Sequence, residues 1–232
     1  MLIITGTGRS GTGTMARMFG GHHEFRVTYI LKKYFWKADP HSDPFDTLEK
    51  RITVMMDLHQ GIEKRSFVDS SNLYIHFLDA VSLLNPSAKF ILCVRNGKDF
   101  VRSAFSRGWH ERISCGTVPL REDPYFTRWD AMTPLQRNAW IWAFRNKRAL
   151  EGLGMLPEGQ KLVIRIEDIN KAEVLDHLEN FTGVKINERA LAEKKHNANP
   201  SLDLPPKEHW THEMNRAFDE IAGEMMRFFK YD

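Results

Sequence analysis

The sequence is poor in cysteine. Its 232 residues include only two, Cys93 and Cys115. Two cysteines cannot form a disulfide framework, and their spacing does not match that of paired metal ligands. We therefore expect both to be small buried side chains, in a protein that folds in a reducing compartment and needs no metal.

Long hydrophobic runs are also missing. No stretch of about 18 apolar residues occurs, as a membrane-spanning helix would require. The N-terminal "MLIIT" leads directly into glycines, without the longer apolar region and cleavage site of a secretory signal. The expectation is a cytoplasmic protein with no membrane partner.

Neither sign of charge dominates the chain. Lys and Arg number 33 and Asp and Glu number 30, and no basic run forms a stripe for nucleic acid. The small basic excess suits an anionic small ligand. The length and the 42% hydrophobic content predict one globular domain over residues 1–232, without a nucleic-acid partner. The sequence does not indicate an oligomeric state.

Short apolar runs alternate with longer segments of helical periodicity. This pattern predicts an α/β fold, a single domain with a central, mostly parallel sheet flanked by helices. The expected strands are residues 2–5, 24–29, 66–69, 89–94 and 161–166. The expected helices are residues 12–20, 45–62, 73–85, 97–107, 134–153, 170–182 and 208–230.

The glycine-rich stretch "ITGTGRSGTGT" at residues 4–14 follows the first expected strand. A strand that runs through a glycine turn into a helix directs several backbone N–H groups and the helix dipole at one small volume. The stretch therefore predicts a cradle for a phosphate or a similar oxyanion. Thr12 stands where the nucleotidase pattern G-x-x-x-x-G-K-[ST] has lysine, and Arg9 supplies a cation inside the loop. The alternative is a glycine turn that binds nothing.

A second motif, "CVRNGKDFVRSAF", follows the expected strand at 89–94. Arg95 comes directly after that strand, where α/β sheets place ligands, and its guanidinium can bind a phosphate through two hydrogen bonds. Ser103 follows about two helical turns later and can add a hydroxyl. The alternative for Arg95 is an ion pair with a carboxylate such as Asp99.

Together these motifs resemble those of the sulfotransferases that use 3′-phosphoadenosine 5′-phosphosulfate (PAPS). The phosphosulfate loop of that family reads R-S-G-T-T or K-S-G-T, and "RSGTGT" occupies residues 9–14 here. Its 3′-phosphate motif reads V-R-N/D-P-x-D with a serine eight residues after the arginine. Weaker likenesses are "KLVIRIEDI" at 161–169, the basic "AEKKHNANPS" at 192–201 with Lys194 or Lys195, and the closing helix "EIAGEMMRFFKYD".

The resemblance implies a P-loop sulfotransferase-like domain and transfer of a sulfuryl group from PAPS to a hydroxyl or amine by in-line displacement. The product would be 3′-phosphoadenosine 5′-phosphate (PAP). Arg9 would act in catalysis by neutralising charge on the leaving oxygen. The donor-binding residues implied are Arg9, Ser10, Gly11, Thr12, Gly13, Thr14, Arg95 and Ser103.

Two segments, 31–65 and 109–130, have no counterpart in this resemblance. We expect them to shape the acceptor pocket, and their aromatic residues suit a sugar or an aromatic ring. The family also often has tyrosine beside the adenine, where this chain has Ile166. Trp109 could stack on the base in its place, or it could be a core residue.

The general base is the weakest part of the resemblance, because residues 28–33 hold no carboxylate where relatives place a glutamate. Asp69, at the end of an expected strand, is our first choice, with a helix N-cap or a partner for Arg9 as its structural alternatives. His22, His23 and Glu24 are expected at the opposite edge of the sheet. Outside candidates are Lys32, Lys33, His41 and His110.

Two other functions remain open. A small P-loop kinase would need Mg²⁺ and a cation on the β- and γ-phosphates, a place that only Arg9 could fill here. A non-catalytic nucleotide-binding protein on the same fold would need no base at all.

Overall fold

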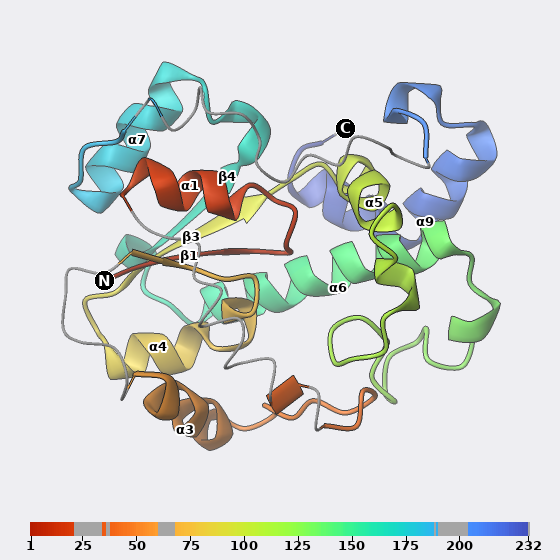
Figure 1. Ribbon diagram of the computed structural model, residues 1–232, viewed down its shortest axis with the longest axis horizontal. Coiled ribbons are helices and arrows are strands. Elements are labelled where there is room, and N and C mark those ends of the chain that lie inside the picture. The colour runs from red at the N-terminus through yellow and green to blue at the C-terminus, as the bar shows by residue number, and fades with distance from the viewer. Residues whose placement is uncertain (21–33, 36–37, 60–67, 188, 190–203, 232) are drawn as a thin grey trace. The chain divides into compact units, whose positions relative to one another are not determined.

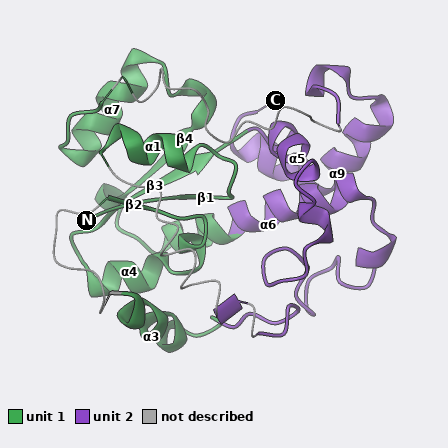
Figure 2. Cartoon of the chain, in the orientation of Figure 1, with its two compact units in different colours: residues 1–32, 45–95, 148–196 green, residues 33–44, 96–147, 197–232 purple. Residues whose placement is uncertain are grey.

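The computed structural model describes residues 1–20, 34–35, 38–59, 68–187, 189 and 204–231 (Figure 1). These residues form two compact units (Figure 2). Described residues of the ranges 1–32, 45–95 and 148–196 make the first unit, and those of 33–44, 96–147 and 197–232 make the second. The organisation of the whole chain as one domain stays a prediction.

A parallel sheet is the centre of the first unit. Its described strands are β1 (Leu2–Gly6), β2 (Val68–Ser70), β3 (Lys89–Val94) and β4 (Lys161–Arg165), in the order β2-β1-β3-β4. Every neighbouring pair is parallel, and Gly6 at the end of β1 is in register with Cys93 of β3. Because both faces are covered, β1 and β3 are apolar along almost their whole length.

Helices cover the two faces of this sheet. Figure 1 shows α1 (Thr12–Met18) and α7 (Ala172–Thr182) on one face, and α3 (Leu48–His59) and α4 (Leu78–Leu84) on the other. Met15 of α1 and Leu178 of α7 are fully buried in the core against Ile4 and Ile91. Side chains alternate between the two faces of a strand, so every second side chain of β1 and β3 points to the face that α1 and α7 cover. The apolar sides of these two helices pack against them there. Short 3₁₀ turns in this unit are η1 (Tyr74–His76), η4 (Glu158–Gln160) and η5 (Ile166–Asp168).

The second unit is mainly helical. It contains α5 (Gly97–Phe105), most of α6 (Pro134–Gly154) and α9 (His212–Phe228), with the turns η2 (Trp109–Glu111), η3 (Trp129–Ala131) and η6 (Lys207–His209). Its core joins Gly97, Trp142 and Phe218, and a Cβ atom on Gly97 would lie 2.7 Å from the Phe218 ring. Gly97 therefore allows α5 to approach both aromatic side chains closely.

The α/β class and the parallel central sheet are confirmed. The expected helices and strands appear within a few residues of their expected ends, except that the strand expected at 24–29 lies outside the described residues. Segment 109–130 has little regular structure, as its prolines and glycine indicate, with two 3₁₀ turns and a bridge between Cys115 and Val118. Both cysteines are free and buried, as expected.

Candidate functional site

The glycine loop begins where the chain changes direction across the sheet. After β1 the chain passes to β2 on one side of β1 and then returns to β3 on the other. In open parallel sheets such a switch leaves a crevice at the carboxyl ends of the two strands, and ligands bind there. The loops that begin at Thr7 and Arg95 both start from this edge.

The loop backbone has an unusual conformation. Gly8, Arg9 and Gly11 have φ values of 81°, 57° and 82°, all in the left-handed region. A residue with a side chain rarely adopts this region, and left-handed residues within a turn can direct neighbouring N–H groups toward one point. The conformation of Arg9 is thus part of the concave loop that the sequence predicts.

Two glycines of the loop are required by packing. A Cβ atom on Gly6 would lie 2.2 Å from Ser10 Oγ and 2.4 Å from the Cys93 carbonyl oxygen. A Cβ atom on Gly11 would lie 2.3 Å from Cγ1 of Ile166. Both contacts are far shorter than side chains permit, so the loop folds back on β1 and β3 and lies against the end of β4 only with glycine at both positions.

The loop offers donors to an oxyanion. Thr14 and Met15 both donate their N–H groups to the Gly11 carbonyl at 3.0 Å, whereas the Thr12 and Gly13 amides have no carbonyl before them in the helix. Gly11, at the N-cap, has no side chain that could accept from these amides. Ser10 Oγ is buried and has no hydrogen-bond partner among the described residues. A phosphate or phosphosulfate group fits these donors.

Arg95 connects the two predicted phosphate motifs. Its Nη1 donates to the Arg9 carbonyl oxygen at 3.1 Å, so residues 86 positions apart in the sequence are in direct contact. Asp99, the carboxylate weighed above as a partner for Arg95, forms an ion pair with Lys207 at 2.5 Å. The next motif residue, Asn96, accepts from the Lys98 amide at 3.0 Å and caps α5.

The other predicted donor-binding residues lie on α1 and α5. Thr12 is buried in the first turn of α1, and Thr14 Oγ1 accepts a long hydrogen bond of 3.4 Å from Arg17 Nη2. Ser103 is buried on α5, within the second unit. Lys194 and Lys195 lie outside the described residues. The roles of these residues stay predictions.

Asp69 lies within β2 and is fully buried. One carboxylate oxygen accepts from the Ser70 amide at 2.7 Å, and the other accepts a hydrogen bond from the Tyr74 hydroxyl. The hydrogen bond from Tyr74 connects β2 with η1. The sequence pattern did not predict this contact. As a catalytic base, Asp69 stays a prediction.

The remaining base candidates are either outside the described residues or bound at one ring nitrogen. His22, His23, Glu24, Lys32 and Lys33 belong to the first group. In the second unit, His41 Nδ1 is 2.8 Å from the Pro119 carbonyl oxygen, so this nitrogen carries the proton. His110 Nδ1 is 3.3 Å from Asn138 Nδ2 and therefore accepts.

The turn after β4 holds Ile166 against the loop. Asp168 accepts from Arg165 Nε at 2.7 Å and pairs with Lys171 at 2.8 Å. Hydrogen bonds from Arg165 and Lys171 lower the pKa of Asp168 to about 2. The "RIED" sequence thus builds an ion-paired turn, and this turn packs Ile166 on Gly11. The Ile166 position was expected beside the adenine, and its contact with the loop was not anticipated.

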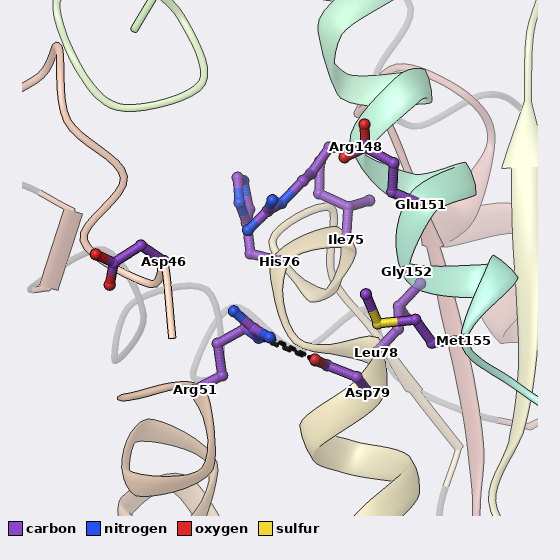
Figure 3. Close-up of a pocket in the computed structure, with 10 residues that line it drawn as sticks. All are labelled: Asp46, Arg51, Ile75, His76, Leu78, Asp79, Arg148, Glu151, Gly152 and Met155. Atoms are coloured by element: carbon purple, nitrogen blue, oxygen red, sulfur yellow. Dashed lines mark hydrogen bonds and ion pairs between the residues drawn. The ribbon is translucent and has the colours of Figure 1, made fainter. Parts of the chain in front are cut away.

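A cavity of about 270 Å³ lies in the first unit, among α3, α4, η1 and the last turns of α6 (Figure 3). Arg51 is fixed in its wall, because Nη2 donates to Asp79 at 2.6 Å and Nη1 donates to the Phe45 carbonyl at 2.6 Å. Asp46 and Arg51 belong to segment 31–65, so part of this segment lines a cavity. The lining residues are Asp46, Arg51, Ile75, His76, Leu78, Asp79, Arg148, Glu151, Gly152 and Met155.

The described part of the chain has neither a metal-binding cluster nor a membrane-spanning helix. No group of three or more histidine, cysteine or acidic side chains there is arranged to hold a metal ion. None of the helices that the structure describes combines the length and the apolar character needed to cross a membrane.

Comparisons with known proteins identify the fold. No protein-family model matches the chain, and no curated protein matches it in sequence. Three solved structures that match are the sulfotransferase domain from the Synechococcus PCC 7002 olefin synthase, the sulfotransferase domain from the curacin biosynthetic pathway, and mouse sulfotransferase SULT7A1 complexed with PAP.

The first is 18% identical, with 100% of this chain and 94% of that chain covered and a TM-score of 0.56. The curacin domain is 19% identical, with coverages of 82% and 76% and a TM-score of 0.55. The mouse protein is 18% identical, with coverages of 97% and 83% and a TM-score of 0.52. The chain therefore has a sulfotransferase-like fold.

Proposed function

We propose that this chain transfers a sulfuryl group from PAPS to a hydroxyl or amine of an acceptor. The observation that carries the proposal is the hydrogen bond from Arg95 to the Arg9 carbonyl, beyond the carboxyl ends of β1 and β3. It brings together two motifs that the sequence assigns to the two phosphate ends of one donor. A solved structure of this fold that contains PAP is consistent with the same donor.

The glycine loop would bind the 5′-phosphosulfate. When bound, the donor supplies an activated sulfuryl group. The Thr12 and Gly13 amides and the buried Ser10 hydroxyl are fixed donors, and Thr14 can add a hydroxyl. Arg9 would neutralise the charge that develops on the leaving oxygen. This task needs preorganised donors at one oxygen, which explains why Thr12 can replace the lysine that a γ-phosphate requires.

Arg95 and Ser103 would bind the 3′-phosphate. The Arg95 hydrogen bond to the Arg9 carbonyl uses one N–H group of Nη1, and the planar guanidinium has further donors in a fixed geometry. Ser103 follows at the motif's spacing on α5 and is proposed as the hydroxyl partner. Removal of either side chain should weaken PAP binding without disturbing the sheet.

Asp69 is the proposed base for the acceptor proton, and Tyr74 is its positioning partner. The Tyr74 hydroxyl and the Ser70 amide hold the two oxygens of Asp69 in one orientation. Loss of a general base slows a reaction roughly 10²- to 10⁴-fold. Asp69→Asn keeps the side-chain shape, so it should lower kcat by about that factor and leave PAP affinity unchanged.

The assay uses ³⁵S-labelled PAPS with phenols, sugars and amines as acceptors, and it measures transferred label and PAP. Label on an acceptor in the wild type, and its loss in Asp69→Asn with PAP affinity retained, support the proposal. Equal turnover in Asp69→Asn would show that another group is the base. Tyr74→Phe should lower kcat less than Asp69→Asn, because the carboxylate is retained. It should also lower the unfolding midpoint, because the buried carboxylate loses a hydrogen bond, so kcat is compared at a temperature where every variant is folded.

The same preparation distinguishes the two alternatives. A kinase would be stabilised against heat by ATP with Mg²⁺ and not by PAP. A non-catalytic binding protein would bind PAP tightly and turn over no acceptor, including water. Either result would replace the proposed transfer.

A further inference from the structure

Two arginine side chains lie against one indole ring in the second unit. The guanidinium carbon of Arg112 is 5.2 Å from the centre of the Trp109 ring, and that of Arg145 is 4.9 Å from the same centre. Phe100 packs edge-on against this ring at 5.5 Å. Trp109, which the sequence offered as an adenine-stacking or a core residue, is 8% exposed and packs within the unit.

A tight turn at residues 112–118 holds this cluster in place. Thr117 is buried, and its one hydroxyl proton is shared between the Arg112 carbonyl oxygen at 2.9 Å and the Ser114 carbonyl oxygen at 2.8 Å. Arg145 Nε donates to the Gly116 carbonyl at 3.0 Å, which joins α6 to the turn. Both guanidinium groups are therefore carried by a preformed framework.

The charges in the cluster repel each other. Arg145 is only 7% exposed, and burial together with the positive charge of Arg112 lowers its pKa to about 10. Burial and the nearby charge of Arg107 also lower the pKa of Arg112. No carboxylate of the described residues forms an ion pair with Arg112. Like charges held together in a partly desolvated place are stabilised when an anion binds near them.

The two arginines differ in access. Arg145 lies beneath the surface, whereas Arg112 is exposed and is followed by Ile113, which is 75% exposed. The cluster thus combines a buried positive charge, an exposed guanidinium and an exposed apolar side chain. The Nη2 group of that guanidinium makes one long hydrogen bond of 3.4 Å to the Arg107 carbonyl. A planar guanidinium suits a carboxylate or sulfate, which it can bind through two parallel hydrogen bonds.

We propose that Arg112 and Arg145 together form a binding site, within the second unit, for the carboxylate or sulfate of a small ring compound. This inference goes beyond the proposed sulfuryl transfer and does not depend on it. It gives a physical role to part of segment 109–130.

The test compares methyl β-D-glucuronide with methyl β-D-glucoside, which differ by one carboxylate. Binding of each sugar is measured by saturation-transfer difference NMR with PAP present throughout, so that the loop cannot capture the carboxylate. Arg112→Gln removes the exposed charge and keeps a polar, although shorter, side chain. Arg216→Gln, at an exposed position on α9, is the matched control for the loss of one positive charge.

We expect the wild type to bind the glucuronide more tightly than the glucoside. Arg112→Gln should lower the affinity for the glucuronide roughly tenfold, as the loss of one charge-assisted hydrogen bond does. Arg216→Gln should bind both sugars as the wild type does. Equal binding of the two sugars by the wild type, or an unchanged preference in Arg112→Gln, would overturn the inference. Failure of the proposed transfer would instead appear as lost PAP binding or lost label transfer, whichever sugar binds.

Discussion

At the scale of single residues, the site depends on two glycines, whose lack of a Cβ atom matters as much as the polar side chains of the loop. Gly6 leaves room for Ser10 Oγ and the Cys93 carbonyl, and Gly11 leaves room for Ile166. Only with this space can the loop close onto β1 and β3 and direct its amides at one point. The buried Ser10 hydroxyl can then donate a hydrogen bond to a ligand.

Gly6→Ala tests this packing. Its Cβ atom would lie 2.4 Å from a backbone oxygen of β3, which cannot rotate away, so the loop must move. We expect PAP affinity to fall at least tenfold, and the free energy of unfolding to fall by about 1–3 kcal/mol, as for overpacked sites. Isothermal titration and urea unfolding measure the two effects. Gly159→Ala is the control, because a Cβ atom there meets nothing within 4 Å, and equal losses in both variants would contradict the account.

Asp168→Asn tests the ion-paired turn that carries Ile166. The pKa of Asp168 is lowered from 3.8 to about 2, so the folded protein binds its proton less readily than the unfolded chain. The resulting stability is present above about pH 4 and is lost as the pH falls through 2. At pH 7 we expect Asp168→Asn to be less stable by about 1–2 kcal/mol, after allowance for solvent screening.

Urea unfolding at pH 7 and at pH 2 measures the difference between the two proteins. It should shrink toward zero at the lower pH. A difference that stays constant between these pH values would show that the Asp168 charge does not hold the turn.

The sequence allowed the positions of Arg9 and Arg95 to be predicted. Both belong to short motifs at strand ends, and parallel strands place their carboxyl ends at one edge. The roles of these residues in binding stay predictions. The Asp69–Tyr74 bond and the Ile166–Gly11 contact could not be predicted. Both depend on strand register and on side-chain directions, which the periodicity of apolar residues does not determine. The Arg112–Trp109–Arg145 cluster joins a turn to a helix, and no local pattern marks such a contact.

At the scale of elements, α5 shows how one motif residue serves the fold. Asn96, between Arg95 and the helix, accepts hydrogen bonds from the Lys98 and Asp99 amides at 3.0 and 3.4 Å. Asparagine is among the best N-cap residues, because its short side chain reaches the free amides of the first turn. The R-N sequence of the motif therefore combines a proposed phosphate ligand with a helix start.

Asn96→Ala should lower the free energy of unfolding by about 1 kcal/mol, the usual effect of losing an N-cap. Asn96→Asp should retain most of the stability, because aspartate caps equally well and suits the helix dipole. Thermal or urea unfolding of the three proteins measures this order. If Asn96→Asp were as unstable as Asn96→Ala, the result would contradict the role of Asn96 as an N-cap.

At the scale of the whole molecule, the order of elements was more predictable than their exact contacts. Alternation of apolar strands with periodic helices was enough to predict the parallel sheet, and the likeness to solved sulfotransferases confirms that fold. The fold does not determine the acceptor, because one scaffold can present many pockets. The described parts of segments 31–65 and 109–130 have local shapes set by side-chain packing, such as the Arg51–Asp79 pair, which composition alone does not indicate.

Titration of PAP into the wild type, Arg95→Ala and Arg216→Ala tests the central claim most directly. Isothermal titration should show one PAP site per chain in the wild type and in Arg216→Ala. Arg95→Ala should bind at least tenfold more weakly, because a guanidinium–phosphate interaction is lost at the edge where the two motifs meet. Unchanged PAP affinity in folded Arg95→Ala would contradict the two-motif donor site and, with it, the proposed sulfuryl transfer.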